Sequence, residues 1–289
     1  MFLGNSEKKG INGFILGMDL DDRYAQISCW LPGEQKPETL SAEAEGEEYM
    51  IPAVLCRRTD RDVWTYGREA LQTAERGEGV LVDHLLSSAL QGKKVEAGGE
   101  IFEATALLAL FIKRSLSLLG GTSRGALRGY RGLEKADFFM FTFEKVDRQA
   151  LEMVERVALL LSLSPERVSC QSRAESFFYY NINQPEELWR HLCMICDFGG
   201  RTLKTMLFEA NHHTRPATVT VSEEEQALLT RHLPEGKEYE AKEPSGVMAE
   251  EMDEAFLALF QKLSAGKIID TIYLIGDGFE GNWYQKTLS

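Results

Sequence analysis

The chain has 289 residues, a length typical of two domains or one large domain, and its 44% hydrophobic and 27% charged residues predict a buried core. Its 45 acidic and 32 basic residues give a net charge of −13, which disfavours nonspecific binding to nucleic acid or to anionic membranes, because both depend on basic patches. The cysteines number five, the N-terminus lacks a signal-peptide pattern, and no apolar run reaches about 18 residues, so we expect a cytoplasmic protein.

The N-terminal segment predicts two strands joined by an acidic turn. Phe14–Leu20 is apolar and carries Asp19 near its end, residues 21–23 form the turn, and Tyr24–Trp30 alternates polar and apolar residues. Shorter elements are expected next: a third strand within 32–48, strands at 51–56 and 63–66, a helix at 68–76, and a loop with a short helix over 77–100.

Helices and strands then alternate. The pattern predicts a helix at 102–119, a glycine- and arginine-rich connector at 122–135, a strand at 138–143, a helix at 147–163, a strand at 168–171 and a helix at 173–180. Asp147 is expected to cap the helix that it begins, because an Asp side chain accepts hydrogen bonds from the first backbone N–H groups of a helix.

The second half of the chain begins with a strand that ends in Asp197. A paired-glycine turn follows, with Gly199, Gly200, Arg201 and Thr202, and leads into a strand at 203–208. A carboxylate at a strand end can hold Mg²⁺, and glycines let backbone N–H groups approach phosphate oxygens, so this turn suits a metal-bound phosphate. An ordinary hairpin with a solvent-facing Asp is the alternative.

The remaining elements are expected in the order strand 217–221, helix 222–232, helix 248–263, strand 268–275 and a helix from about 282. The chain therefore contains a weak internal duplication, in which each half has strand, turn, strand, strand, helix, strand and helix, and the first half adds one more helix and strand. Two α/β lobes of this kind, each with an Asp-bearing hairpin, would clamp one metal–phosphate group between them.

The order of these motifs resembles the actin, sugar kinase and heat-shock chaperone ATPase superfamily. FILGMDLDDRYAQISCW stands where that family has its first phosphate loop, CDFGGRT matches the second phosphate loop, and TIYLIGDGFEGNWYQKTL is similar to the adenosine segment. The resemblance covers nearly the whole chain. It implies an α/β fold of two duplicated ribonuclease-H-like lobes with mixed five-stranded sheets: a first lobe at 11–185 with an outer subdomain inserted at about 35–135, and a second lobe at 186–289 whose C-terminal part is missing.

The resemblance also implies a site for ATP and Mg²⁺. Asp19 and Asp197 would hold the metal through water, and Gln171 would orient the attacking water. The residues expected at the nucleotide come from three loops: Asp21, Asp22 and Arg23; Gly199, Gly200, Arg201 and Thr202; and Gly276, Asp277 and Gly278.

The first loop departs from the family pattern. The family usually has a glycine and hydroxyl side chains after the strand, and this chain has Asp21, Asp22 and Arg23 instead. Two extra carboxylates repel phosphate unless they help to hold a metal. In addition, Ser172 stands where the chaperones place the Glu that positions water.

Two classes of function follow. The leading hypothesis is a Mg–ATP-binding module with slow or absent hydrolysis, which acts as a conformational switch for a protein partner or for self-association. The competing hypothesis is a non-catalytic actin-like scaffold that no longer binds nucleotide, and the acidic first loop favours it. A sugar-kinase-like phosphotransferase ranks below both, because no acidic base is identifiable at a substrate position.

The sequence gives no support for a P-loop, hydrolase, histidine metal site or redox cysteine pair. The chain lacks the G-x-x-x-x-G-K-[ST] pattern of P-loop NTPases and the G-x-S-x-G pattern of hydrolases. His212-His213 has no cysteine or carboxylate at metal-ligand spacing. Cys193 and Cys196 form a CxxC within a predicted strand, where residues three apart point to opposite faces, so we exclude a redox pair.

Overall fold

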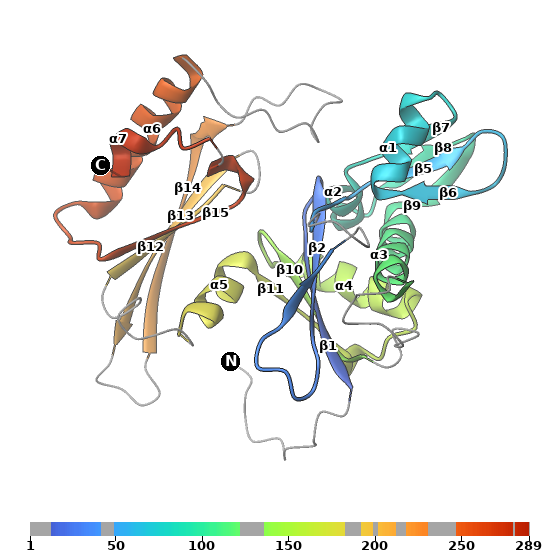
Figure 1. Cartoon of the computed structure of the whole chain (residues 1–289), viewed down its shortest axis with the longest axis horizontal. Coiled ribbons are helices and arrows are strands. Elements are labelled where there is room, and N and C mark those ends of the chain that lie inside the picture. The colour runs from blue at the N-terminus through green and yellow to red at the C-terminus, as the bar shows by residue number, and fades with distance from the viewer. Residues whose placement is uncertain are drawn as a thin grey trace. The chain divides into compact units, whose positions relative to one another are not determined.

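The structure, a computed structural model, describes residues 13–41, 49–121, 136–182, 192–198, 202–211, 218–230, 247–279 and 281–288 (Figure 1). The chain divides into two compact units, Met1–Arg173 and Ala174–Ser289. Each unit contains a mixed sheet with helices, so the predicted α/β class is confirmed. Among the described residues, no helix is long and apolar enough to cross a membrane.

The central sheet of the first unit has six strands. They are β1 (Phe14–Leu20), β2 (Tyr24–Trp30), β3 (Glu38–Leu40), β4 (Ile51–Pro52), β10 (Ala136–Phe143) and β11 (Val168–Ser172). The order is β11-β10-β1-β2-β3, and β4 also pairs with β2, so the sheet has one strand more than the five predicted. β1, β10 and β11 are parallel, whereas β2 is antiparallel to β1, β3 and β4. The carboxyl ends of β1, β10 and β11 therefore meet at one edge of the sheet.

The core of this unit forms from the alternating side chains of its strands. Leu16 and Met18 of β1 are buried together with Phe139 and Phe141 of β10, whose ring centroids lie 4.4 Å apart. The helices α3 (Ala104–Gly121) and α4 (Arg148–Leu160) add apolar side chains to the same cluster, among them Phe111. Asp147 caps α4 as predicted, since its Oδ1 accepts the Ala150 N–H at 3.0 Å.

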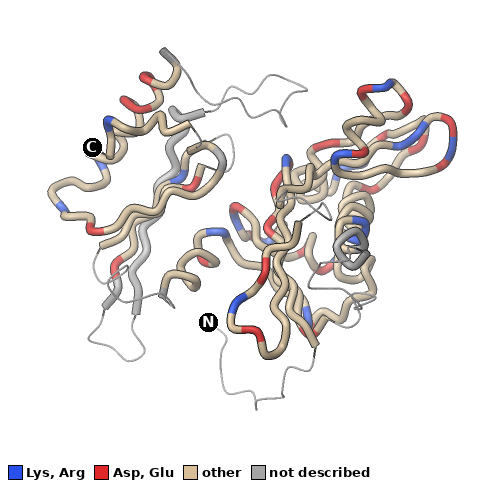
Figure 2. The backbone as a smooth tube through the Cα atoms, viewed as in Figure 1, with Lys and Arg blue, Asp and Glu red and all other residues tan. Residues whose placement is uncertain are grey.

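A smaller region follows β4 in the chain. It contains β5 (Leu55–Arg58), β6 (Trp64–Tyr66), α1 (Gly67–Glu75), β7 (Gly79–Val82), α2 (Leu85–Leu90), β8 (Lys94–Ala97) and β9 (Glu100–Glu103). The strands form the sheet β6-β5-β7 and the hairpin β8-β9. Figure 2 shows acidic and basic residues interspersed along the loops of this region.

The prediction of a loop with a short helix over 77–100 was incomplete. The short helix is α2, but the prediction missed β7 and β8 and the start of β9. These strands are four residues long, too short for a period-two pattern, and β7 forms because it pairs with β5.

The second unit contains one four-stranded sheet. Its elements are α5 (Arg173–Ile182, whose first residue belongs to the first unit), β12 (Leu192–Asp197), β13 (Thr202–Asn211), β14 (Thr218–Thr230), α6 (Val247–Ser264), β15 (Thr271–Ile275) and α7 (Gln285–Leu288). The order is β14-β13-β12-β15, with β12 antiparallel to β13 and parallel to β15. In the first unit, β1 stands in the same relation to β2 and β10.

Two predicted elements of this unit were wrong in type or length. In place of the helix expected at Ser222–His232, residues 222–230 belong to strand β14, in which Glu223 is in register with Met206 of β13. Residues 231 and 232 lie outside the described residues. Glutamate-rich sequence favours a helix locally, but the backbone hydrogen bonds to β13 override that preference. The strand expected at 268–275 begins only at Thr271, and Ile268 is exposed.

The sheet of the second unit has apolar side chains on both faces. One face packs Met194, Cys196 and Phe198 against Phe256 of α6. The other face carries Cys193 and Ile195, against which Phe177 and Phe178 of α5 pack. The strand ending in Asp197 is therefore held between two helices, as expected for a strand that is parallel to a neighbour.

Candidate functional site

The turn between β1 and β2 is closed by its own first residue. The Oδ1 atom of Asp21 accepts the N–H groups of Arg23 at 2.7 Å and Tyr24 at 2.8 Å, and the Asp21 N–H donates to the Tyr24 carbonyl at 3.0 Å. This is the Asx-turn geometry that an aspartate favours at the first position of a turn. One of the two extra carboxylates of the first loop therefore has a local structural use.

Arg173 joins Asp21 to Asp19. Its Nε atom lies 2.8 Å from Asp19 Oδ1 and 3.0 Å from Asp19 Oδ2, and one terminal nitrogen donates to Asp21 Oδ2 at 3.2 Å. The Arg173 side chain is only 12% exposed. These charge-assisted hydrogen bonds place a guanidinium where the sequence predicts a metal-bound phosphate.

The position of Arg173 follows from the sheet. It is the first residue after β11, and β1, β10 and β11 are parallel, so the residue after β11 and the end of β1 lie at the same sheet edge. Sequence reasoning missed this arginine. The available signal was a basic residue directly after a strand parallel to the one that carries Asp19.

Gln171 lies in one row with Asp19. Asp19 is in register with Thr142, and Thr142 is in register with Gln171, so the three residues share one row across β1, β10 and β11. Adjacent strands lie about 4.8 Å apart, which puts Asp19 and Gln171 roughly 10 Å apart across the sheet. The predicted water-orienting residue is therefore on the same row as the predicted metal-binding residue.

The other two residues of the first loop also have internal partners. Asp22 Oδ1 accepts the Ser87 N–H at 2.8 Å in the first turn of α2, and its Oδ2 lies 3.6 Å from His84 Nδ1. Arg23 is buried, its carbonyl accepts the Ala53 N–H at 2.7 Å, and its guanidinium lies 5.6 Å from the centre of the Tyr24 ring. The loop as a whole joins β1 and β2 to α2 and to the segment after β4.

In the second unit, the structure brings the end of β12 next to the loop after β15. The Phe198 N–H donates to the Ile275 carbonyl, and the Gly278 N–H donates to the Phe198 carbonyl, both at 2.9 Å. Asp197 therefore ends β12 and Gly276 directly follows β15, its parallel neighbour, with Asp197 in register with Ile275. Thr202 begins β13, Asp277 begins the short 3-10 helix Asp277–Phe279, and Gly199, Gly200 and Arg201 lie outside the described residues.

Gly278 is needed for this contact. A Cβ atom at this position would overlap the carbonyl oxygen and the ring of Phe198. Phe198 packs edge-on against Phe279 and Trp283, with ring centroids 5.9 and 6.1 Å apart, and Trp283 Nε1 donates to the Gly278 carbonyl at 2.8 Å. Gly278 was predicted to lie at the adenosine. Its close contact with Phe198 explains the need for a glycine without any ligand.

The cysteines of the CxxC lie on opposite faces of β12, as predicted. Cys193 belongs to the cluster beside α5 and Cys196 to the cluster beside α6. Burial raises the pKa of Cys193 to about 11 and that of Cys196 to about 12, so both thiols stay protonated at neutral pH.

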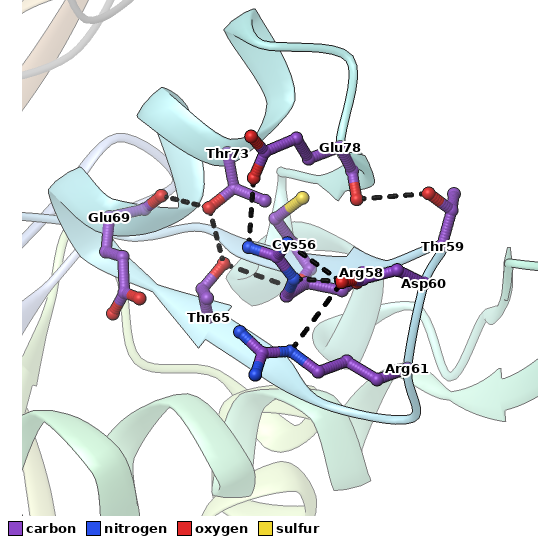
Figure 3. Close-up of polar contacts among 9 residues, drawn as sticks. All are labelled: Cys56, Arg58, Thr59, Asp60, Arg61, Thr65, Glu69, Thr73 and Glu78. Atoms are coloured by element: carbon purple, nitrogen blue, oxygen red, sulfur yellow. Dashed lines mark hydrogen bonds and ion pairs between the residues drawn. The ribbon is translucent and has the colours of Figure 1, made fainter.

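A second cluster of charged side chains lies on β5–β7 (Figure 3). Arg58 donates to Asp60 at 2.8 Å and lies 3.0 Å from Glu78, and Thr59 donates to the Glu78 carbonyl at 3.2 Å. Within α1, the Thr73 hydroxyl donates to the Glu69 carbonyl at 2.7 Å. This network ties β5 and the turn after it to the segment between α1 and β7, so we assign it to structure.

Within the described ranges, no group of three or more His, Cys, Asp or Glu side chains is placed to hold a metal ion. A family described as "Family of unknown function (DUF5716) C-terminal" matches residues 36–289, which is most of the chain. No curated protein shows a significant match.

Proposed function

We propose that this chain, which belongs to the DUF5716 C-terminal family, is a non-catalytic interaction module with an actin-like fold. In this proposal an internal guanidinium takes the place of the metal-bound phosphate at the first loop. The observation that carries it is the contact of Arg173 with both carboxylate oxygens of Asp19 and with Asp21.

Magnesium would have to compete with this guanidinium. A cation that coordinates Asp19 directly competes with Arg173 for both carboxylate oxygens, and a displaced Arg173 would lose two carboxylate partners in a largely buried place. A hydrogen bond to a charged group contributes about 1.5 to 3 kcal/mol, so displacing Arg173 is costly before any phosphate contact forms. The carboxylates of Asp21 and Asp22 are also engaged by backbone N–H groups, which leaves them less able to turn toward a metal.

The contact between Gly278 and Phe198 supports the same function. In the nucleotide hypothesis, the glycines after β15 leave room for adenosine and phosphate. Here the backbone and ring of Phe198 fill the space beside Gly278, and Trp283 covers its carbonyl group.

A double-mutant cycle on Asp19 and Arg173 tests the proposal without a ligand. If the pair is structural, Asp19→Asn and Arg173→Met each lower the free energy of unfolding by about 1 to 3 kcal/mol, and the double variant loses less than the sum. Urea unfolding followed by circular dichroism measures all four proteins. If Asp19 instead belongs to an empty metal site, Asp19→Asn relieves repulsion among carboxylates and raises stability, an outcome that contradicts the proposal.

A nucleotide-binding switch is the second candidate. The observation that favours it is the shared row of Asp19 and Gln171 at the carboxyl edge of the sheet, together with Asp197 beside the glycine loop in the other unit. Calorimetric titration with ATP and Mg²⁺ separates the two functions. We expect no heat of binding for the wild type, whereas binding that Asp197→Ala abolishes would establish the switch in place of the interaction module.

A further inference from the structure

Strand β15 forms one edge of the sheet in the second unit, and its sequence, TIYLI, is uncharged and largely apolar. All five of its side chains stay partly exposed, whereas Cys193–Cys196 of the neighbouring strand β12 are buried. The opposite edge strand, β14, contains Glu223–Glu225, and charged residues of this kind protect a sheet edge against pairing. β15 has no charge, proline or glycine that would protect it in the same way.

The backbone of β15 directs hydrogen-bonding groups away from β12. The Phe198 N–H donates to the Ile275 carbonyl, so Ile275 faces β12. Backbone groups alternate in direction along a strand, so Tyr273 also faces β12, and Ile272 and Leu274 direct their N–H and C=O groups the other way. Among the described residues, β15 pairs with no strand on that side. In the first unit, β10 stands beside β1 as β15 stands beside β12, and strand β11 covers its other edge. A further strand therefore fits beside β15.

We propose that this strand is β15 of a second copy of the chain, antiparallel to the first about a two-fold axis at Tyr273. In this register the two Tyr273 residues lie opposite each other, and Ile272 of each copy lies opposite Leu274 of the other. Ile272 and Leu274 then exchange their outward N–H and C=O groups as hydrogen-bonded pairs, with the tyrosines as the non-hydrogen-bonded pair between them. The edge is thus self-complementary, as an interface between identical copies must be.

The side chains agree with this register. Residues directly opposite each other in an antiparallel pair lie on the same face of the sheet, so Ile272 meets Leu274 on the face that α6 covers, and the tyrosines meet on the face that α5 covers. Beyond the strand end, Asp270 lies opposite Gly276 of the other copy, so the two copies set no acid against an acid there. This inference goes beyond the proposed function, because neither nucleotide nor the contact between Asp19 and Arg173 enters it.

Cysteine cross-linking of the full chain tests the register. Tyr273→Cys places one thiol of each copy at the axis, with Cα atoms about 4.5 Å apart, within the range of about 4.4 to 6.8 Å for a disulfide. Ile275→Cys is the matched control, since it lies on the same face of the same strand but is roughly 14 Å from its counterpart in this register. After treatment with oxidised glutathione, we expect a covalent dimer of Tyr273→Cys on a non-reducing gel and little of Ile275→Cys. No cross-linking in either variant, or a yield for Ile275→Cys that equals or exceeds that for Tyr273→Cys, would overturn the inference.

Sedimentation equilibrium supplies a second test at concentrations of about 10 to 300 μM, the range expected for a small contact. We expect a reversible dimer of the wild type, and a dissociation constant at least about tenfold higher for Tyr273→Lys and for Tyr273→Glu, because each sets like charges opposite each other. An equimolar mixture of the two variants sets opposite charges at the axis and is expected to dimerise more tightly than either variant alone. A monomeric wild type, or a mixture that dimerises no more tightly, would contradict the β15 pair.

Tyr273 also packs against Phe177, with ring centroids 4.9 Å apart, so circular dichroism must show that the charged variants stay folded. If they unfold, the comparison of Tyr273→Cys with Ile275→Cys and the association of the wild type decide the matter.

Discussion

Gly278 is a residue whose role differs from the one its motif indicates. It lies in a glycine loop that resembles a nucleotide-binding segment, yet its hydrogen bond and its lack of a side chain both serve the contact with Phe198. A motif therefore locates a glycine correctly without showing whether a ligand or a neighbouring chain segment comes close to it.

Gly278→Ala is expected to lower the free energy of unfolding by about 2 to 3 kcal/mol, because the new methyl group overlaps backbone as well as the Phe198 ring. Denaturant unfolding measures the change. Gly266→Ala is the control: Gly266 has φ +80° but open space around it, so only backbone strain of about 1 kcal/mol is expected. Similar losses in the two variants would show that steric overlap at Phe198 is not the cause.

Between elements, α6 and α7 are joined by one buried carboxylate. Asp253 of α6 accepts hydrogen bonds from the Lys286 N–H at 2.7 Å, the Thr287 N–H at 3.1 Å and the Thr287 hydroxyl at 2.7 Å. It therefore satisfies the first N–H groups of α7, as an N-cap residue does, although it is 33 or more residues away in sequence.

Asp253→Ala is expected to destabilise the chain by about 2 to 3 kcal/mol, since two backbone N–H groups and a hydroxyl lose a charged acceptor. Glu254→Ala provides the control, because exposed Glu254 approaches Lys286 Nζ only to 4.0 Å and such a pair contributes little. Thermal unfolding followed by circular dichroism compares the two. Equal stability of the two variants would rule out the role given to Asp253.

The β8–β9 hairpin is tied to β5 by Arg57. This buried arginine donates to the Ala97 carbonyl at 3.0 Å and to Glu100 at 2.8 Å, and it lies 5.0 Å from the centre of the Phe102 ring. The hydrogen bond from Arg57, followed by its positive charge, lowers the pKa of Glu100 below its ordinary value of 4.5.

A carboxylate with a lowered pKa contributes stability at neutral pH, and that contribution is lost as the pH falls through the lowered pKa. Glu100→Gln is therefore expected to be less stable than the wild type at pH 7 and to match it once the pH is well below 4.5. Urea midpoints across this pH range measure the difference. Glu103→Gln serves as the control, since Glu103 lies 3.5 Å from an exposed lysine. A Glu100→Gln deficit that persists in acid would contradict this origin.

For the whole molecule, the two units carry separate halves of the predicted nucleotide site. Asp19 and Gln171 belong to the first unit, and Asp197 and Gly278 belong to the second. The clamp that would join the two halves stays a prediction. The cycle on Asp19 and Arg173 tests the first half on its own, and the titration tests the two halves together.

Much of the fold could be predicted because local patterns specify it. The alternation of polar and apolar residues in Tyr24–Trp30 predicted β2, and the Asp147 position predicted the cap of α4. Both features depend on residues within a few positions of each other. Only the start of strand β14 was predicted, as a strand at 217–221. Its continuation to Thr230 was missed, because the glutamates favour a helix in isolation and only the pairing with β13 makes this segment a strand.

The sequence by itself determined the α/β class, the strands that end near Asp19 and Asp197, and the acidic character of the first loop. Only the tertiary structure decided what faces that loop. Arg173 is 154 residues from Asp19, and the parallel order of β1, β10 and β11 brings them to one sheet edge. Spacing along the chain reports which residues share a helix or strand, but the partner of a buried charge is set by sheet order, which no local pattern encodes.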